Sequence, residues 1–223
     1  MTVDPLADWA RRLEAVVPTV RADQLSRFTP PPGRDHRRAA VLMLFGPGAD
    51  GEGEVVLLER AADMRSHASQ AAFPGGALDP GEDAVAAALR EADEETGLQQ
   101  VGVRVLGELP EVYLPPSGFA VTPVVGWWEQ PCELYARDPA EVARVVRAPL
   151  PELVDPRNRF TTRLSLGYRG PAFVVDGLFV WGFTAGLLSR LLALAEIGGP
   201  WDTALERPVP PEQLVGLALE VQE

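Results

Sequence analysis

The chain has 223 residues, of which 46% are hydrophobic and 23% are charged, a composition typical of a folded globular protein with one generous core. Its formal net charge of −12 excludes a protein that binds nucleic acid without sequence preference, because such a protein needs a basic face to meet the phosphates. All 20 basic residues are arginine, which excludes a Schiff-base lysine and a phosphate-loop lysine.

The sequence has no evident segment for secretion or membrane insertion. Residues 1–17 contain acids and a proline where a secretory signal needs a basic stretch and an apolar run. No segment approaches the ~20 consecutive apolar residues that span a bilayer. The lone Cys132 has no partner for an intramolecular disulfide. We therefore expect a cytoplasmic protein with no membrane partner.

The first 35 residues are expected to form an extension to the main domain. Residues 6–17 have the pattern of a peripheral helix, and the prolines of the following TPPPGRD keep that connection out of regular structure. Residues 36–200 should form the main domain. It begins with two apolar runs, AAVLMLF from Ala39 and VVLLE from Val55, which are typical of two paired strands joined by a loop.

A helix is predicted from Glu82 to Thr96. This segment is rich in Ala, Glu, Leu and Arg, which are strong helix formers. Pro80 and Gly81 precede it and Gly97 follows it, and acids are expected to fill its first turn. These are the usual signals for the start and the end of a helix.

The rest of the chain predicts three more strands and a second long helix. The strands lie within residues 101–110, 119–128 and 141–150, and the neighbouring Trp127 and Trp128 should face opposite sides of the sheet. Residues 181–196 have apolar positions at helical spacing. Strands on both sides of a helix indicate an α/β sandwich with a mixed sheet. The tail, residues 201–223, either packs on the domain or helps to build a dimer.

The predicted helix gathers acids that should repel one another. At 100° per residue, Glu91, Glu94 and Glu95 share an arc of about 100°, whereas Asp93 points elsewhere toward solvent. Each like-charge pair at ~5 Å costs on the order of 3 kcal/mol before screening, and Arg90 offsets only part of this repulsion. A solvated acidic face is the simplest interpretation of a charge run. The alternative is a site for Mg²⁺ or Mn²⁺, the cations that all-oxygen ligands select.

Two glycines ahead of the helix favour the cation site. Gly75 and Gly76 have no side chains, so the backbone of their loop can approach a metal or a phosphate closely. The loop leads directly into the acidic helix. A solvated acidic face explains neither these glycines nor the apolar strands on both sides.

The spacing of these residues resembles the Nudix hydrolase box. The matching positions span 23 residues, with Ala92 in place of a larger aliphatic residue, and they are Gly76, Glu82, Arg90, Glu91, Glu94, Glu95, Gly97 and Leu98. The resemblance implies a Nudix-type α/β/α sandwich that hydrolyses a nucleoside diphosphate linked to another group, by attack of water at phosphorus. Homodimerisation is a further expectation from the family.

The resemblance also implies roles for these residues. Glu91, Glu94 and Glu95 are expected to be metal ligands or the general base, with the Gly75 carbonyl as a further ligand. Glu82, Arg90 and Gly76 would orient the helix and its loop. The catalytic set is therefore Glu94, Glu91, Glu95 and Arg90. Glu94 ranks slightly ahead of Glu91 as the base, and Glu141 is a weaker candidate outside the box.

The segment just upstream resembles the signature of the coenzyme A pyrophosphatase branch of the family. The residues in register are Arg60, Arg65, His67, Gln70, Phe73 and Pro74, whereas Leu58, Ala61 and Ser69 depart from the usual residues. The resemblance implies that Arg60, Arg65, His67, Gln70 and Phe73 bind the substrate. From residue chemistry alone the arginines suit phosphates, His67 is equally well an exposed loop residue, and Phe73 and Pro74 are better suited to shaping the loop.

The implied substrate is coenzyme A or one of its thioesters, cleaved with Mg²⁺ or Mn²⁺. Two alternatives stay open. The first is a Nudix pyrophosphatase for another nucleoside diphosphate derivative, such as ADP-ribose or NADH, which the departures at Leu58 and Ser69 raise. The second is a Nudix-like ligand sensor without turnover, which an intact set of three glutamates disfavours.

Overall fold

The computed structural model describes residues 8–26, 28, 36–49, 51–64, 67–115, 117–164 and 167–214. The predicted proline-rich connection, Arg65 and the last nine residues lie outside the described residues. The helices are α1 (Asp8–Val16), α2 (Ala22–Leu25), α3 (Ala84–Thr96), α4 (Leu150–Val154) and α5 (Gly182–Leu194). Short 3-10 turns are η1 (Val17–Thr19), η2 (Gln100–Gly102), η3 (Pro156–Asn158) and η4 (Pro211–Leu214).

The described residues form two sheets. The larger has the strand order β3-β2-β1-β7-β5, with β4 beside β1, β6 beside β7 and β8 beside β2. Its strands are β1 (Arg37–Gly46), β2 (Glu54–Arg60), β3 (Ala71–Ala72), β4 (Gly75–Ala77), β5 (Val103–Glu108), β6 (Val112–Leu114), β7 (Phe119–Trp128) and β8 (Val142–Pro149). β1 runs parallel to β7 and antiparallel to β2 and β4. The prediction of a mixed sheet is confirmed.

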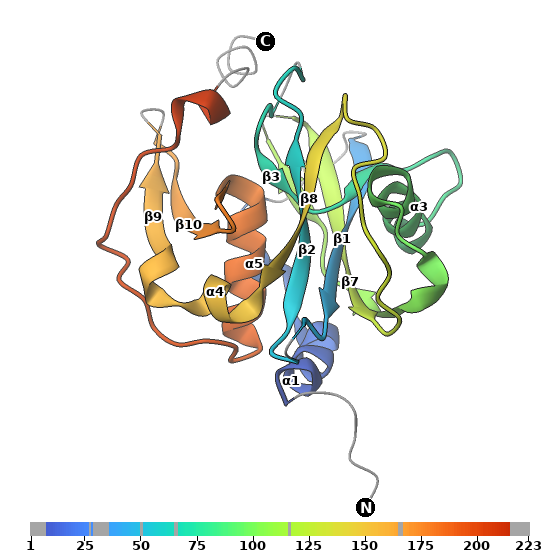
Figure 1. The fold of residues 1–223 in the computed structure, drawn as a ribbon, viewed down its shortest axis with the longest axis horizontal. Coiled ribbons are helices and arrows are strands. Elements are labelled where there is room, and N and C mark those ends of the chain that lie inside the picture. The colour runs from blue at the N-terminus through green and yellow to red at the C-terminus, as the bar shows by residue number, and fades with distance from the viewer. Residues whose placement is uncertain are drawn as a thin grey trace, which may run out of the picture.

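The larger sheet lies between two layers of helix (Figure 1). Helix α3 covers one face, and α5 with the N-terminal helix α1 covers the other. Alternation along β1 explains both layers, because Leu42 and Leu44 belong to the core under α3 whereas Met43 and Phe45 belong to the core under α5. Burial of each such side chain stabilises the fold by about 1.5–3 kcal/mol.

The paired tryptophans obey the same alternation. Trp128 is buried in the core under α3, whereas Trp127 lies on the other face, where its ring centroid is 5.5 Å from that of Trp9. The predicted opposite orientation is confirmed. Both rings serve packing between the sheet and its helices.

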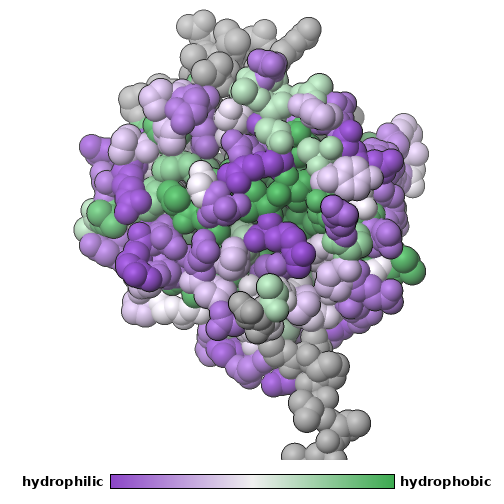
Figure 2. Space-filling model, viewed as in Figure 1, coloured by the Kyte–Doolittle hydropathy of each residue, from purple (hydrophilic) through white to green (hydrophobic). Residues whose placement is uncertain are grey.

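A second, three-stranded sheet was not predicted. It has the order β11-β10-β9 and consists of β9 (Arg159–Arg163), β10 (Arg169–Val175) and β11 (Leu178–Val180), all antiparallel. On the face of the molecule that Figure 2 shows, hydrophobic side chains gather in a band across the middle, over β8, α5 and β10. Hydrophilic side chains surround this band. Among the described residues, no helix is long and apolar enough to cross a bilayer.

Candidate active site

Helix α3 begins two residues later than predicted. Asp83 is its N-cap, and its carboxylate accepts a hydrogen bond of 2.8 Å from the Ala86 amide. The acids Glu82 and Asp83 therefore precede the first turn, which itself contains no acid. Gly97 ends the helix in the left-handed conformation with a φ of 70°, which glycine adopts without strain. These two caps fix where the acidic residues of the helix lie.

The two glycines ahead of α3 allow close approaches that other residues would prevent. Gly75 and Gly76 belong to β4 and pair with Val41 and Ala40 of β1. A Cβ atom at Gly75 would lie 2.3 Å from the Ala40 carbonyl oxygen, and the φ of Gly75 is 156°. A Cβ atom at Gly76 would lie 2.5 Å from a carboxylate oxygen of Glu91. The carboxylate of Glu91 therefore rests directly on the backbone of β4.

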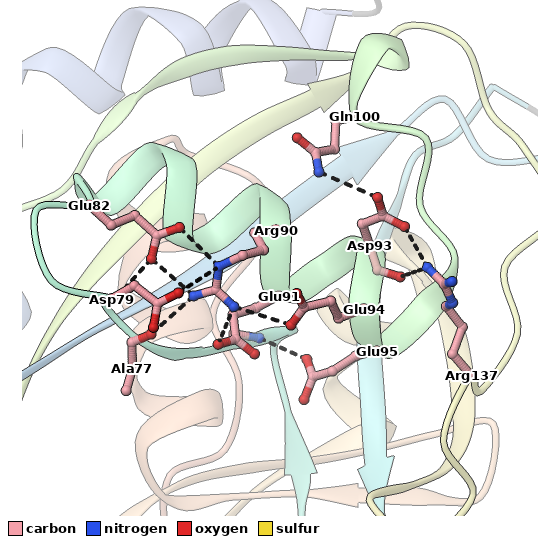
Figure 3. A network of polar contacts seen from close by, with 11 residues as sticks. Ala77, Asp79, Glu82, Arg90, Glu91, Asp93, Glu94, Glu95, Gln100 and Arg137 are labelled. Atoms are coloured by element: carbon pink, nitrogen blue, oxygen red, sulfur yellow. Dashed lines mark hydrogen bonds and ion pairs between the residues drawn. The ribbon is translucent and has the colours of Figure 1, made fainter.

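Arg90 is the centre of the polar network in Figure 3. Its Nε and Nη2 donate to the two carboxylate oxygens of Glu82 at 2.9 and 3.0 Å, and Nη2 also donates to the Ala77 carbonyl at 3.2 Å. Its Nη1 donates to Glu91 at 2.9 Å and to Glu94 at 3.1 Å. The bond with Glu82 raises the pKa of Arg90 and lowers the pKa of Glu82. Arg90 thus ties the helix to the loop before it and also neutralises two of its acids.

Glu95 differs from the other acids because it is buried. Glu95 is only 9% exposed, and its carboxylate accepts a hydrogen bond of 2.9 Å from the Gly75 amide. Burial raises the pKa of Glu95 to about 7, and the negative charges of Glu91 and Glu141 act in the same direction. The Gly75 amide and the positive charge of Arg60 oppose this shift. The charges of Arg60 and Glu141 thus act on Glu95 of helix α3, which is called the carboxylate helix because it carries Glu91, Glu94 and Glu95.

Asp93 points away from this network, as the helical spacing predicts (Figure 3). Its carboxylate accepts hydrogen bonds from Arg137 at 2.8 Å and from Gln100 at 3.4 Å. Asp93 therefore has its own ion-pair partner on the opposite side of α3. The sequence predicted the direction of Asp93 but not Arg137, which reaches it from a loop 44 residues away.

The loop between β7 and β8 closes the C-terminal end of α3. The amides of Tyr135 and Arg137 donate to the carbonyls of Thr96 and Glu95 at 3.0 and 3.1 Å, which satisfies two groups that a helix end leaves without partners. The same loop ends at Glu141, whose carbonyl accepts from the Ala61 amide at 2.9 Å. This loop brings Glu141, the acid outside the box, next to the end of β2.

The substrate segment, residues 60–74, is the stretch for which the sequence predicts substrate binding, and Arg60 at its start acts through its charge on Glu95 of α3. Arg60 ends β2, its amide donates to the Gln70 carbonyl at 3.0 Å, and its buried Nε bonds to no residue in the described part of the chain. His67 Nδ1 lies 2.9 Å from Gln70 Oε1. Phe73 is only 3% exposed and packs in the core on the α5 side of the sheet. The position of Phe73 therefore agrees with the loop-shaping role and offers no exposed ring to a ligand.

The donor set of the carboxylate helix fits a divalent cation. Glu91, Glu94, Glu95 and Gly75 offer carboxylate and carbonyl oxygens, the kind of ligand that Mg²⁺ and Mn²⁺ take in proteins. Across the described ranges no group of three or more His, Cys, Asp or Glu side chains is already arranged to hold a metal ion. Instead, the Arg90 guanidinium bridges Glu91 and Glu94, while Glu95 bonds to Gly75. A positive charge already bridges two of these acids, so the residues fit a cation in chemistry and in charge.

Comparison with known proteins decides the family. A family model described as "NUDIX domain" matches residues 35–160, which include β1, β2, the glycine loop and α3. The chain belongs to the Nudix family. The family resemblance predicted from the acidic helix and its glycines is therefore confirmed. Nudix hydrolases generally use divalent metal ions and act on small nucleotide derivatives.

Curated Nudix relatives cover most of the chain. A protein of Citrobacter koseri named "Uncharacterized Nudix hydrolase NudL" is 37% identical over 83% of this chain and 92% of its own length. A protein of the same name from Photorhabdus laumondii is 33% identical over 79% of this chain and 98% of its own length. Among solved structures, the Nudix hydrolase RenU of M. smegmatis has a TM-score of 0.54 at 20% identity, over 75% of this chain and 90% of that one. RenU supports the fold alone.

Proposed function

We propose that this Nudix hydrolase cleaves the diphosphate of coenzyme A or its thioesters with Mg²⁺ or Mn²⁺. The products would be 3′,5′-adenosine bisphosphate and 4′-phosphopantetheine or its acyl form. The observation that carries this proposal is the position of Arg60, whose charge acts on buried Glu95 and whose buried Nε bonds to no described residue. A phosphate oxygen would satisfy this donor, as charge-assisted hydrogen bonds between arginine and phosphate do.

The three carboxylates have environments suited to different roles. Glu95 is buried against Gly75, Glu91 has a side chain 20% exposed, and Glu94 has a side chain 59% exposed. We assign metal binding to all three together with the Gly75 carbonyl. We rank Glu94 first as the general base, because its exposed carboxylate is open to water. A bound divalent cation would polarise the phosphorus and lower the pKa of the attacking water.

The substrate segment would bind the phosphates beside these carboxylates. Arg60 and His67 supply cationic or donor groups, and Gln70 holds His67 through its side-chain oxygen. Arg65, outside the described residues, is assigned to the same role from the sequence. Glu82 and Arg90 keep the loop and the helix in register through their paired hydrogen bonds. A cytoplasmic location and a homodimer remain predictions from the sequence and the family.

A second candidate substrate is another nucleoside diphosphate derivative, such as ADP-ribose or NADH. The departures from the branch signature at Leu58, Ala61 and Ser69 are the observation that favours it. The surroundings of these residues weaken the case for this second substrate. Leu58 and Ala61 are buried in the packing, and Ser69 has a φ of 56°, the left-handed conformation that favours the glycine usual at this position. The departures therefore alter packing and strain more than ligand chemistry.

A substrate panel tests this proposal. Purified protein is incubated with coenzyme A, ADP-ribose, NADH and nucleoside triphosphates, each with Mg²⁺ or Mn²⁺, and the products are resolved by chromatography. We expect coenzyme A to give the highest kcat/KM. A tenfold preference for ADP-ribose or a triphosphate would overturn the substrate assignment and leave the enzyme class intact. No turnover of any substrate would favour the ligand sensor.

A further inference from the structure

The C-terminal turn η4 reaches back to the substrate segment through Gln213. Gln213 is only 5% exposed, and its side chain accepts a hydrogen bond of 2.6 Å from the Trp181 indole and donates one of 3.3 Å to the Phe179 carbonyl. Its main-chain carbonyl accepts a hydrogen bond of 3.0 Å from the side chain of Gln70. Gln213 therefore connects η4, β11, the start of α5 and the substrate segment.

Gln70 also contacts His67 and Arg60, the two described residues proposed to bind the substrate phosphates. Its side-chain oxygen lies 2.9 Å from His67 Nδ1, and its main-chain carbonyl accepts from the Arg60 amide at 3.0 Å. One side chain thus contacts the C-terminal turn with its nitrogen and His67 with its oxygen. Displacement of Gln70 would move His67 and the end of β2 together.

The substrate segment needs such support because its backbone is strained. His67 and Ser69 have φ values of 55° and 56°, a region that residues other than glycine seldom occupy unless their surroundings hold them there. A second anchor lies nearby, where the Thr184 hydroxyl donates to the Ala71 carbonyl at 3.0 Å. Both anchors come from sequence beyond residue 160, where the match to the family model ends.

We propose that Gln213 is a positioning residue for the substrate. Its buried amide fixes η4, the main-chain carbonyl of Gln213 holds Gln70, and Gln70 holds His67 and Arg60 where the phosphates of the nucleotide bind. The substrate site is therefore completed by a C-terminal turn outside the matched family region. This inference rests on the proposed function for the identity of the ligand, but not for the contact between Gln213 and Gln70.

Two measurements on Gln213→Ala test the inference. Hydrogen exchange at the amides of residues 60–72 reports the order of the segment without any substrate, and steady-state kinetics use the panel substrate that the wild type turns over fastest. We expect faster exchange at Arg60 and Gln70, a KM about five- to tenfold higher, as the loss of one or two hydrogen bonds predicts, and a kcat within about twofold of wild type. Glu212→Gln, an exposed neighbour in η4, is the matched control and should change neither exchange nor kinetics.

A second variant guards against misfolding of the first. Gln70→Ala breaks the same connection at a half-buried site, so it should raise KM by a similar factor, and the double variant should be no worse than the single ones. Unchanged exchange in Gln213→Ala, or an equal loss of kcat and kcat/KM, would overturn the inference. Additive losses in the double variant would also overturn it. A wild type that hydrolyses a nucleotide other than coenzyme A would overturn the substrate assignment alone.

Discussion

Three glutamates on one helix occupy three different environments. Arg90 Nη1 bridges Glu91 and Glu94, and the Gly75 amide donates to Glu95. These bonds offset part of the repulsion that the spacing predicts, but the pKa of Glu95 still rises to about 7 because its carboxylate is buried. Burial thus disfavours the ionised form of Glu95, and a cation bound to its oxygens would favour that form again, which is the physical reason to expect a cation there.

Replacement of Glu94 by Gln tests the role of the exposed carboxylate. The amide keeps the shape of the side chain but can neither bind a metal with a negative charge nor accept a proton. We expect kcat to fall by about 10²–10⁴-fold with an unchanged thermal midpoint. Asp93→Asn is the matched control on the same helix, since Asp93 bonds to Arg137 on the opposite side. A Glu94→Gln enzyme with wild-type turnover would remove Glu94 from the catalytic set.

Replacement of Gly76 by Ala tests the close approach of the loop to the helix. The new Cβ would lie 2.5 Å from the Glu91 carboxylate, so this flexible side chain must move away. We expect activity or metal affinity to fall about 10–100-fold, the usual effect of disturbing a residue that supports a metal ligand. Gly199→Ala is the control, because its Cβ would meet no atom within 4 Å. A metal titration of Gly76→Ala that coincides with those of Gly199→Ala and wild type would contradict this role for Gly76.

At the scale of elements, local signals were enough to predict α3. Strong helix formers and a terminal glycine lie within or next to the segment itself, although the start was predicted two residues early because the N-cap Asp83 was counted in the first turn. The long apolar runs of β1, β2 and β7 were likewise sufficient. The short strand β4 was not predicted, because its three residues become a strand only through pairing with β1. The second sheet also depends on contacts between separate segments, and such contacts leave no periodic pattern in a short strand.

The cap of α3 gives a stability prediction. Asp83→Ala removes the acceptor for the Ala86 amide, so the free energy of unfolding should fall by about 1 kcal/mol. Asp83→Asn retains an acceptor oxygen and should stay close to wild type. Urea unfolding followed by circular dichroism measures both variants. If Asn and Ala lower the midpoint equally, the hydrogen bond at the N-cap is not the source of the effect.

In the site, as in the fold, features within one segment could be predicted from the sequence, whereas contacts between separate segments could not. Spacing on one helix predicted that Glu91, Glu94 and Glu95 share a face and that Asp93 does not. The partner of Asp93, Arg137, belongs to a separate loop, and the contact between Gln70 and Gln213 joins residues 143 positions apart. No local motif marks Arg137 or Gln213, since each acquires its role only when the chain folds.

At the scale of the whole molecule, the net charge of the protein has the same sign as the charge of the proposed substrate, so the two repel each other. The chain carries a formal net charge of −12, yet the proposed substrate is an anion. Local cations must therefore overcome the overall field. Arg60 supplies one such charge beside Glu95, and a divalent metal on the carboxylates would supply another. Turnover should accordingly depend on the metal as much as on any single side chain.

The most direct test is to follow the release of 3′,5′-adenosine bisphosphate from coenzyme A by wild-type protein, first with Mg²⁺ or Mn²⁺ and then with excess EDTA. We predict that product forms with metal, stops in EDTA and returns when metal is added above the chelator concentration. Circular dichroism recorded in EDTA should show the fold unchanged. Product release that persists in EDTA, or no product with either metal, would contradict a metal-dependent coenzyme A diphosphatase.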